Sequence, residues 1–287
     1  MHKALEQMNI KLQHVIADIT GKSGQEIIQA IIAGERNPVK LAAFCDGRIR
    51  ANKKESIIKS LEGVWKEEHI FELEQSFVLY HVYHEKIREC DQQIEKHLRE
   101  KSGINKKGEE QIKVRSNKNN LNFDAKEILQ SITGTDLSEI FGITETNAVE
   151  LISEVGINME KWPTVKHFTS WLNLAPNNKI SGGKLLSSRI PKKKNHAGQI
   201  FKMAAFAVQR SDNWLAKFFQ RMKSKRGTQK AVVATARKIA VIFYKLLREK
   251  TKFNPVPIEM YMDGFKQYQI KKLKRHALSL GYQLVDM

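Results

Sequence analysis

A heptad seam between Leu73 and Leu98 predicts that this part of the chain forms one long helix. Its members follow one another at alternating spacings of four and three: Leu73, Phe77, Tyr80, His84, Ile87, Asp91, Ile94 and Leu98. A strand would instead alternate every second residue. The seam predicts half of a coiled coil, completed by another helix of the chain or by a second copy. An amphipathic helix on a domain core explains the pattern equally well. His84 and Asp91 are interpreted as register-setting polar residues rather than catalytic ones.

Helical signals also precede the seam. Apolar residues near the start step by three and four, as on one buried helix face: Leu5, Met8, Leu12, Val15 and Ile19. This spacing predicts a single helix that Thr20-Gly21 ends. Ser23 and Glu26 have the spacing of a capping box for a second helix, which Gly34 terminates. Asn37-Pro38 is the start signal of a third helix, and a fourth is expected over 54–61.

The second half shows the same periodicity. Helices are predicted over 125–131, 144–155, 164–172, 197–209, 214–225, 229–249 and 257–280, with a loop at 173–194 and no strand alternation. Residues 104–124 are rich in Lys, Asn and Gly and predict a linker. The predicted fold is mainly α. It comprises a helical and coiled-coil region over 1–103, the linker over 104–124, and an all-helical domain over 125–287 that carries a helix-hairpin-helix and a Gly-rich serine loop.

Positive charge is concentrated in one window of the chain. From Lys179 to Lys252 there are 20 Lys and Arg against 2 acids, and 20 − 2 = +18 equals the net charge of the whole protein. Such a field favours a polyanion: DNA, RNA or an acidic membrane surface. No apolar run approaches the roughly 20 residues of a membrane span, so we expect no membrane attachment. Cys45 and Cys90 form no CxxC pair, which suits a reducing cytoplasm. No set of metal ligands is recognisable; His81-Val82-Tyr83-His84-Glu85 lacks the HExxH order.

Ser181-Gly182-Gly183-Lys184 lies at the start of this basic window. It is not a Walker A loop, because Asn178 stands where that pattern requires Gly. Two glycines allow the backbone to fold around an oxyanion and leave the serine hydroxyl unobstructed. The nearby cations suited to phosphodiester oxygens are Lys184, Arg189, Lys192, Lys193 and Lys194. Two interpretations stay open here: a catalytic serine, which would need a base or a metal, and a glycine-rich phosphate-binding loop.

A second phosphate-binding candidate is Ile140-Phe141-Gly142-Ile143-Thr144. It has the pattern of a helix-hairpin-helix, in which Gly142, Ile143 and Thr144 bring backbone and helix N–H groups to a DNA phosphate. An ordinary connection between two helices explains the same residues. Further along, Lys217, Arg221 and Lys225 step by four along one helix, and more cations follow at Lys230, Arg237-Lys238 and Lys245. The scarcity of acids there favours a nucleic-acid track over a merely solvated face.

From Asn122 to the C terminus, the chain resembles the IS110 family of insertion-sequence transposases, whose second domain is called the Transposase-twenty domain. The matching elements, in chain order, are Ile132-Thr133-Gly134-Thr135-Asp136-Leu137, Phe141-Gly142-Ile143, Ile152-Ser153-Glu154-Val155-Gly156, Phe168-Thr169-Ser170-Trp171-Leu172-Asn173-Leu174-Ala175-Pro176, Asn178-Lys179-Ile180-Ser181-Gly182-Gly183-Lys184, Ser188-Arg189, Asn195, and Ala231 to Leu247. The segment from Met1 to Gly103 also resembles the middle region of that family, including its coiled coil.

The resemblance implies DNA transposition between insertion-sequence ends and a target, guided in some members by a structured RNA. It implies that Ser181 forms a covalent bond to DNA phosphate. In this family, magnesium is bound by carboxylates of an N-terminal RuvC-like domain. Met1 opens directly into what resembles the connecting helix, so we expect an N-terminally truncated copy: a pseudogene product, one half of a frameshifted gene, or a re-annotated start. We expect no cofactor bound by this chain alone, and Mg only together with the RuvC-like domain.

Three functional hypotheses follow. The first is a transposase that binds DNA, with possible guide RNA, and cannot complete strand transfer alone. The second is a non-catalytic DNA-binding regulator that associates with full-length transposase through its coiled coil. The third is a basic RNA-binding protein unrelated to transposition. A homo-oligomer formed through the coiled coil and a nucleoid-associated cytoplasmic location, bacterial or archaeal, are also expected.

Overall fold

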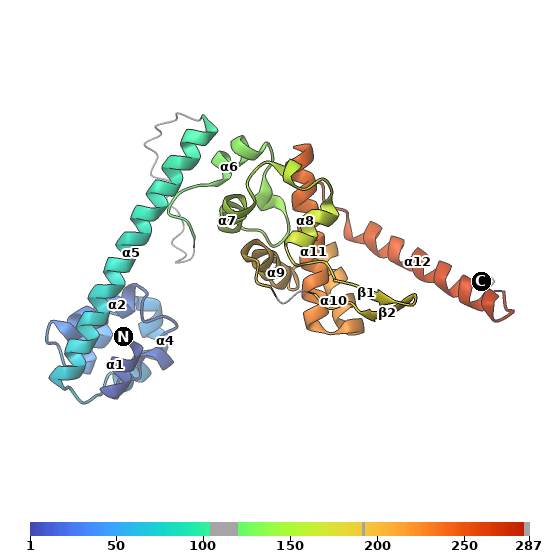
Figure 1. Cartoon of the computed structure of the whole chain (residues 1–287). Helices are drawn as coiled ribbons and strands as arrows, with labels where there is room; N and C mark the ends of the chain where they lie inside the picture. The colour runs from blue at the N-terminus through green and yellow to red at the C-terminus, as the bar shows by residue number, and fades with distance from the viewer. Residues whose placement is uncertain (104–119, 191–192, 284–287) are drawn as a thin grey trace. The chain divides into compact units, whose positions relative to one another are not determined.

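The computed structural model describes residues 1–103, 120–190 and 193–283, and these are mainly helical, as the sequence predicts (Figure 1). They divide into two compact units, Met1–Cys90 and Asp91–Met287. Unit 1 contains α1 (His2–Gln7), a 3-10 turn η1 (Leu12–His14), α2 (Lys22–Ile32), α3 (Pro38–Ala43), α4 (Gly47–Ser60) and the first part of α5 (Glu67–Ser102). The predicted linker falls largely on residues 104–119, outside the described residues.

The single helix predicted up to Ile19 is wrong. α1 ends at Gln7, Asn9 has a φ of 58°, and η1 follows after a turn. Asn tolerates this left-handed conformation better than most residues, so the chain can reverse there. Leu5, Met8, Leu12 and Ile19 are nevertheless all buried in the core of unit 1. The spacing of the apolar residues therefore identified the buried side chains correctly. The backbone that carries them is not one helix, because it turns at Asn9.

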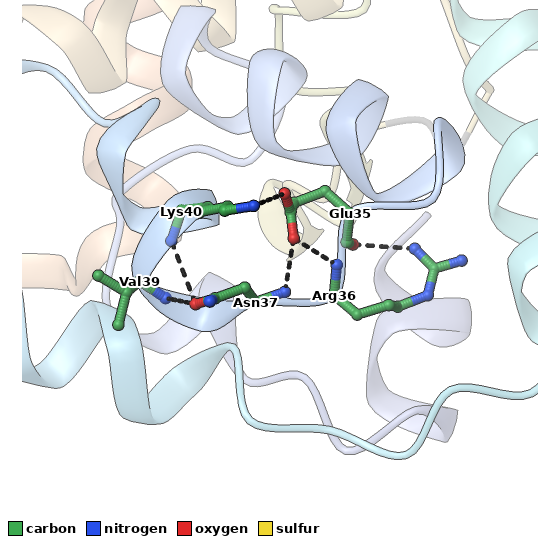
Figure 2. A network of polar contacts seen from close by, with 5 residues as sticks. All are labelled: Glu35, Arg36, Asn37, Val39 and Lys40. Carbon is green, nitrogen blue, oxygen red and sulfur yellow. Dashed lines mark hydrogen bonds and ion pairs between the residues drawn. The ribbon is translucent and has the colours of Figure 1, made fainter.

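Capping around α2 and α3 is partly as predicted. Gly34 ends α2 with a φ of 100°, and Asn37 caps α3 by accepting a hydrogen bond from the Val39 N–H at 2.9 Å (Figure 2). The Glu35 carboxylate accepts the N–H groups of Arg36 and Asn37, at 2.9 and 2.8 Å. The Ser23 capping box is wrong: Gly21 is the N-cap of α2, and the Ser23 hydroxyl instead accepts the Asp46 N–H at 2.9 Å. The Ser23 side chain thus ties α2 to the start of α4.

The long helix predicted from the seam is confirmed as α5, Glu67–Ser102. Within unit 1, Leu73 is buried and Phe77 packs against the core, whereas Ile87 is 53% exposed. Within unit 2, the Asp91 carboxylate is buried and accepts two hydrogen bonds from Asn122, the side-chain amide at 2.6 Å and the backbone N–H at 3.2 Å. Asp91 therefore makes a contact within the chain, and a coiled-coil partner for α5 stays a prediction.

Unit 2 is built around α11 (Thr228–Glu249), which packs against α8 (Val165–Trp171), α9 (His196–Val208) and α10 (Trp214–Arg226). Before them lie α6 (Lys126–Thr133), η2 (Leu137–Glu139), α7 (Glu145–Val155) and η3 (Met159–Lys161), and α12 (Ile258–Ser279) follows. Phe168 of α8 and Phe243 of α11 stack with ring centroids 6.3 Å apart. Beside them, the buried Tyr244 hydroxyl donates a hydrogen bond to the Trp162 carbonyl oxygen at 2.8 Å.

The loop predicted over 173–194 is wrong in its centre. It contains an antiparallel hairpin of β1 (Lys179–Ser181) and β2 (Lys184–Ser187), with Ser181 paired to Lys184 (Figure 1). Ile180, Leu185 and Leu186 are all exposed, at 65%, 58% and 69%. Because the hairpin buries neither face, its sequence has no alternation of apolar and polar residues, and that alternation is the usual signal of a strand.

Candidate nucleic-acid interface

Ser181 is the last residue of β1, and its side chain is exposed. Gly182 and Gly183 form the two-residue turn of the hairpin, with φ values of 54° and 73°. A two-residue hairpin with positive φ at both central positions is the type I′ turn, which glycine adopts without strain. A Cβ built on either glycine would meet nothing within 4 Å. The backbone conformation therefore requires the glycines, and the serine hydroxyl lies beside an open turn.

Three asparagines fix the base of the hairpin. The Asn177 N–H donates to the Arg189 carbonyl oxygen at 3.0 Å, and the Asn173 amide donates to the Lys193 carbonyl oxygen at 3.0 Å. Asn195 is the N-cap of α9: its side-chain oxygen accepts the Gly198 N–H at 2.7 Å. The amide nitrogen of Asn195 donates to the Trp171 carbonyl oxygen at 3.1 Å. The hairpin is thus held against the end of α8 and the start of α9.

The hairpin and the segment that follows it carry exposed cations and no acids. Lys184, Arg189, Lys193 and Lys194 are exposed, and no ion pair holds any of them among the residues that the structure describes. Lys192 lies outside the described residues. The sequence contains no Asp or Glu between Glu160 and Asp212. Their charge is therefore available to an anionic ligand, and a phosphodiester is the anion whose oxygens such side chains bind.

The helix-hairpin-helix residues lie at the turn before α7. Gly142 has a φ of 84°, and a Cβ on it would lie 2.5 Å from the Ala204 carbonyl oxygen of α9. Ile143 is buried in the core of unit 2. Thr144 is exposed and caps α7: its hydroxyl accepts the Asn147 N–H at 3.2 Å. The packing against α9 and the core explains why Gly and Ile stand at positions 142 and 143. A phosphate contact at this turn stays a prediction, and Thr144 is the residue that would make it.

A pocket of about 590 Å³ lies between α10 and α11. Its lining is largely apolar, and Ser188 and Ile190, just after β2, contribute to its wall. The cations that reach it are Arg226, Lys230, Arg237 and Lys238. The pocket therefore places a cluster of positive charge next to the chain segment that carries Ser181.

Two of the cations predicted to form a nucleic-acid track, Lys238 and Arg221, lie against aromatic rings. The Lys238 ammonium lies 4.8 Å from the Phe218 ring centroid and 5.5 Å from that of Trp214. The Arg221 guanidinium lies 4.1 Å from the Phe265 ring centroid of α12. Burial, together with Arg221, lowers the pKa of Lys238. The sequence signal for this cluster is the pair of stripes on α10: Trp214, Phe218 and Met222 step by four beside Lys217, Arg221 and Lys225.

The described residues do not form a metal centre. No group of three or more His, Cys, Asp or Glu side chains in 1–103, 120–190 and 193–283 is placed to hold a metal ion. The donors around Ser181 are cationic and therefore do not suit magnesium, which prefers carboxylate and other oxygen ligands. In the same ranges, no helix combines the length and the apolar character needed to cross a bilayer.

Comparison with known proteins identifies the domain that holds this site. Residues 134–220 match the model of the Transposase IS116/IS110/IS902 family. The match begins at Gly134, which ends α6, and runs through the Ser181 hairpin and α9 into α10. No curated protein matches the chain. Residues 134–220 thus match a domain of the IS116/IS110/IS902 family of insertion-sequence transposases, and this match covers the hairpin that carries Ser181.

Proposed function

We propose that this protein binds DNA through the basic face around its hairpin and that Ser181 is the nucleophile that attacks a DNA phosphate. The observation that carries the proposal is an exposed serine at a glycine turn, paired in the hairpin with Lys184, followed in the chain by Arg189, Lys193 and Lys194, and far in sequence from any acid. The family match supports a role in transposition. Exposure matters because an in-line attack needs the hydroxyl to approach a backbone phosphate without obstruction.

In the covalent step the Ser181 oxygen forms a bond to phosphorus and one P–O bond of the DNA backbone breaks. The released deoxyribose oxygen takes up a proton, and the serine proton passes to a base. A serine hydroxyl is a weak nucleophile until a base removes its proton. The charged side chains of the hairpin and of the described segment just after it are lysines and arginines, which donate hydrogen bonds and accept none. The cations can stabilise charge on the phosphate oxygens, but the base must come from elsewhere.

This leads to a complementation experiment. The chain is incubated with insertion-sequence end DNA and Mg²⁺, alone or with a full-length relative whose own serine is replaced by alanine. We expect a covalent protein–DNA adduct on this chain only in the mixture, measured as a shifted band on a denaturing gel. The adduct should be lost in Ser181→Ala and retained in Ser187→Ala, a serine of the same hairpin. An adduct that survives Ser181→Ala would refute the nucleophile, and one formed by the chain alone would refute the need for an external base.

A second function, that of a regulator bound to full-length transposase, is favoured by the surface of α5. Within unit 1 this helix exposes Val78, Leu79, Val82 and Tyr83. Apolar side chains at helical spacing on an exposed face are typical of a helix that packs against another helix. Light scattering of the chain alone and mixed with the full-length enzyme would test this. Unchanged mass in both samples, with unchanged transposition, would exclude the regulator.

A further inference from the structure

The pocket between α10 and α11 has a lining that selects among ligands. Its apolar wall comes from Leu174, Phe218, Met222, Val233, Val241 and Ile242. Its charged groups are Arg226, Lys230, Arg237 and Lys238, and no carboxylate is among its described lining residues. Lys and Arg donate hydrogen bonds and accept none. The pocket therefore suits a ligand with an apolar body and many hydrogen-bond acceptors.

Trp214 provides an independent observation. This residue lines the pocket, and its indole N–H is buried without a hydrogen-bond acceptor in the described structure. Buried polar groups are nearly always paired in proteins, and an unpaired one is costly. A carbonyl oxygen or ring nitrogen of a ligand in the pocket would satisfy this donor once a small shift of the surrounding side chains uncovers the indole N–H. Lys238, half-buried beside it, likewise has no carboxylate partner among the described residues.

The position of the pocket links it to the hairpin. Ser188 and Ile190 line the pocket, and they follow β2 directly in the chain. A volume of about 590 Å³ lies in the range of small-ligand sites, about 300–1,000 Å³, so one base and its sugar fit. Arg226 and Lys230, which flank the α10–α11 turn, are exposed and free to meet phosphates on either side of that nucleotide.

We propose that this pocket holds one unstacked base of the DNA strand whose backbone lies at Ser181. The aliphatic wall would cover the faces of the base, and the indole N–H of Trp214 and the Lys238 ammonium would donate to its carbonyl oxygens. This rests on the proposed function, since it assumes that DNA occupies the basic face. Extruding a base from a duplex costs stacking and pairing energy. The preferred substrate is therefore a strand that is already unpaired or bulged at this position.

The test compares two DNA duplexes that are identical except for one bulged nucleotide, a thymidine in the first and an abasic residue in the second. Fluorescence anisotropy with the full chain should show about tenfold tighter binding of the thymidine bulge. Ala234→Trp fills the pocket from α11 and should abolish this preference while binding of the abasic duplex stays unchanged. Ala207→Trp, at an exposed alanine of α9, is the matched control and should keep it. Equal affinity of the unmodified chain for both duplexes would overturn the proposal.

Crosslinking keeps the proposal testable if Ala234→Trp fails to fold. A 5-iodouracil at the bulge, irradiated in complex with the unmodified chain, should attach to the α10 peptide that contains Trp214, Phe218 and Met222. Attachment only to residues that do not line the pocket would refute it. An equally tight RNA bulge would refute the assignment to DNA. If no DNA binds at all, the proposed function fails first; if DNA binds without a base preference, only the pocket fails.

Discussion

Gly142 lies so close to α9 that a Cβ built on it would be 2.5 Å from the Ala204 carbonyl oxygen and 2.6 Å from a Val208 methyl group. Its φ of 84° adds backbone strain for any other residue. We predict that Gly142→Ala lowers the free energy of unfolding by about 3 kcal/mol, the sum of left-handed strain and overpacking. Urea denaturation followed by circular dichroism measures this loss.

Gly134→Ala is the control for the strain alone. Gly134 ends α6 with a φ of 76°, and its nearest neighbours are atoms of the flexible Lys250 side chain at 3.4 Å. Gly134→Ala should therefore lower the free energy of unfolding by only about 1 kcal/mol. Equal losses in the two variants would show that α9 yields to the new methyl group. If Gly142→Ala were also to weaken DNA binding with stability intact, the turn would contact DNA rather than serve packing.

Asn195 is predicted to hold the hairpin through two separate hydrogen bonds, one accepted from Gly198 and one donated to Trp171. Asn195→Ala removes both and should lower the free energy of unfolding by about 1–2 kcal/mol. Asn195→Asp keeps the N-cap acceptor and loses only the donor, so its loss should be smaller. Thermal unfolding ranks the variants. If Asn195→Asp lost as much stability as Asn195→Ala, the hydrogen bond donated to Trp171 would account for the whole effect.

The ion pair between Lys126 and Asp136, 2.9 Å apart, predicts a pH dependence of stability. Burial alone would raise the pKa of the Asp136 carboxyl, but hydrogen bonds from Ser138 and Lys126 outweigh it and hold the pKa below its ordinary value. A carboxyl with a lowered pKa in the folded state stabilises the fold above its unfolded pKa, near 3.9. That stabilisation is lost as the pH falls through the folded value.

Asp136→Asn should therefore be less stable than the unmodified chain at pH 7, and the difference should shrink as the pH falls below about 4. The asparagine can still accept the Ser138 N–H, so the change isolates the charge. Asp136→Ala also removes that cap and should cost about 1 kcal/mol that persists at low pH. Unfolding curves of the three proteins at pH 7 and pH 3 check this. If the stability difference between the unmodified chain and Asp136→Asn were the same at pH 7 and pH 3, the charge of Asp136 would not be the cause.

The helices were predictable because their signals are local. Those from α6 to α12 agree with the predicted ranges within one or two residues at most ends, since apolar period and capping residues both lie inside each element. The start of α4 was missed: Asp46 caps it, but a kink at Lys53, with a φ of −139°, interrupts the period. The helix predicted through Ile19 failed because a turn at Asn9 buries the same side chains.

The residues of the candidate site were recognisable in the sequence, whereas their geometry was less so and their chemistry stays a prediction. Ser181 and its glycines are exposed at a tight turn, which the residue types alone suggest. The strands of the hairpin lack the signal of a buried face, because Ile180 and Leu185 are exposed, and only the Gly182-Gly183 pair points to its turn. The packing of Gly142 on Ala204 and of Lys238 on Phe218 depends on contacts between helices distant in sequence. The stripe of Trp214, Phe218 and Met222 on α10 is a local signal for such a cluster, but it does not show that a half-buried lysine of α11 packs on it.

The cations of the hairpin are predicted to set the salt dependence of DNA binding. Each phosphate contact contributes about 0.9 to the slope of log K against log salt concentration. Lys184→Gln and Arg189→Gln should each reduce that slope by about 0.9, and the double variant by about twice as much. Lys40→Gln is the control, because Glu35 already neutralises Lys40 at 3.5 Å. An unchanged slope in the double variant would place the DNA elsewhere on the protein.

Lys238 is predicted to stabilise the complex and to destabilise the free protein. Its ammonium is half-buried on Phe218 and Trp214, and burial lowers its pKa, so the charged form is disfavoured in the folded state. Lys238→Met keeps the length of the side chain and its contact with the rings, so the free energy of unfolding should rise. The affinity for DNA should fall while the salt slope stays unchanged, because Lys238 is proposed to donate to a base and not to a phosphate. A slope smaller by about 0.9 would place Lys238 at a phosphate instead. The control is Lys217→Met on α10, where the lysine pairs with Asp212 at 3.2 Å, and it should give no gain in stability. If Lys238→Met were less stable than the unmodified chain and bound DNA equally tightly, Lys238 would serve the fold alone.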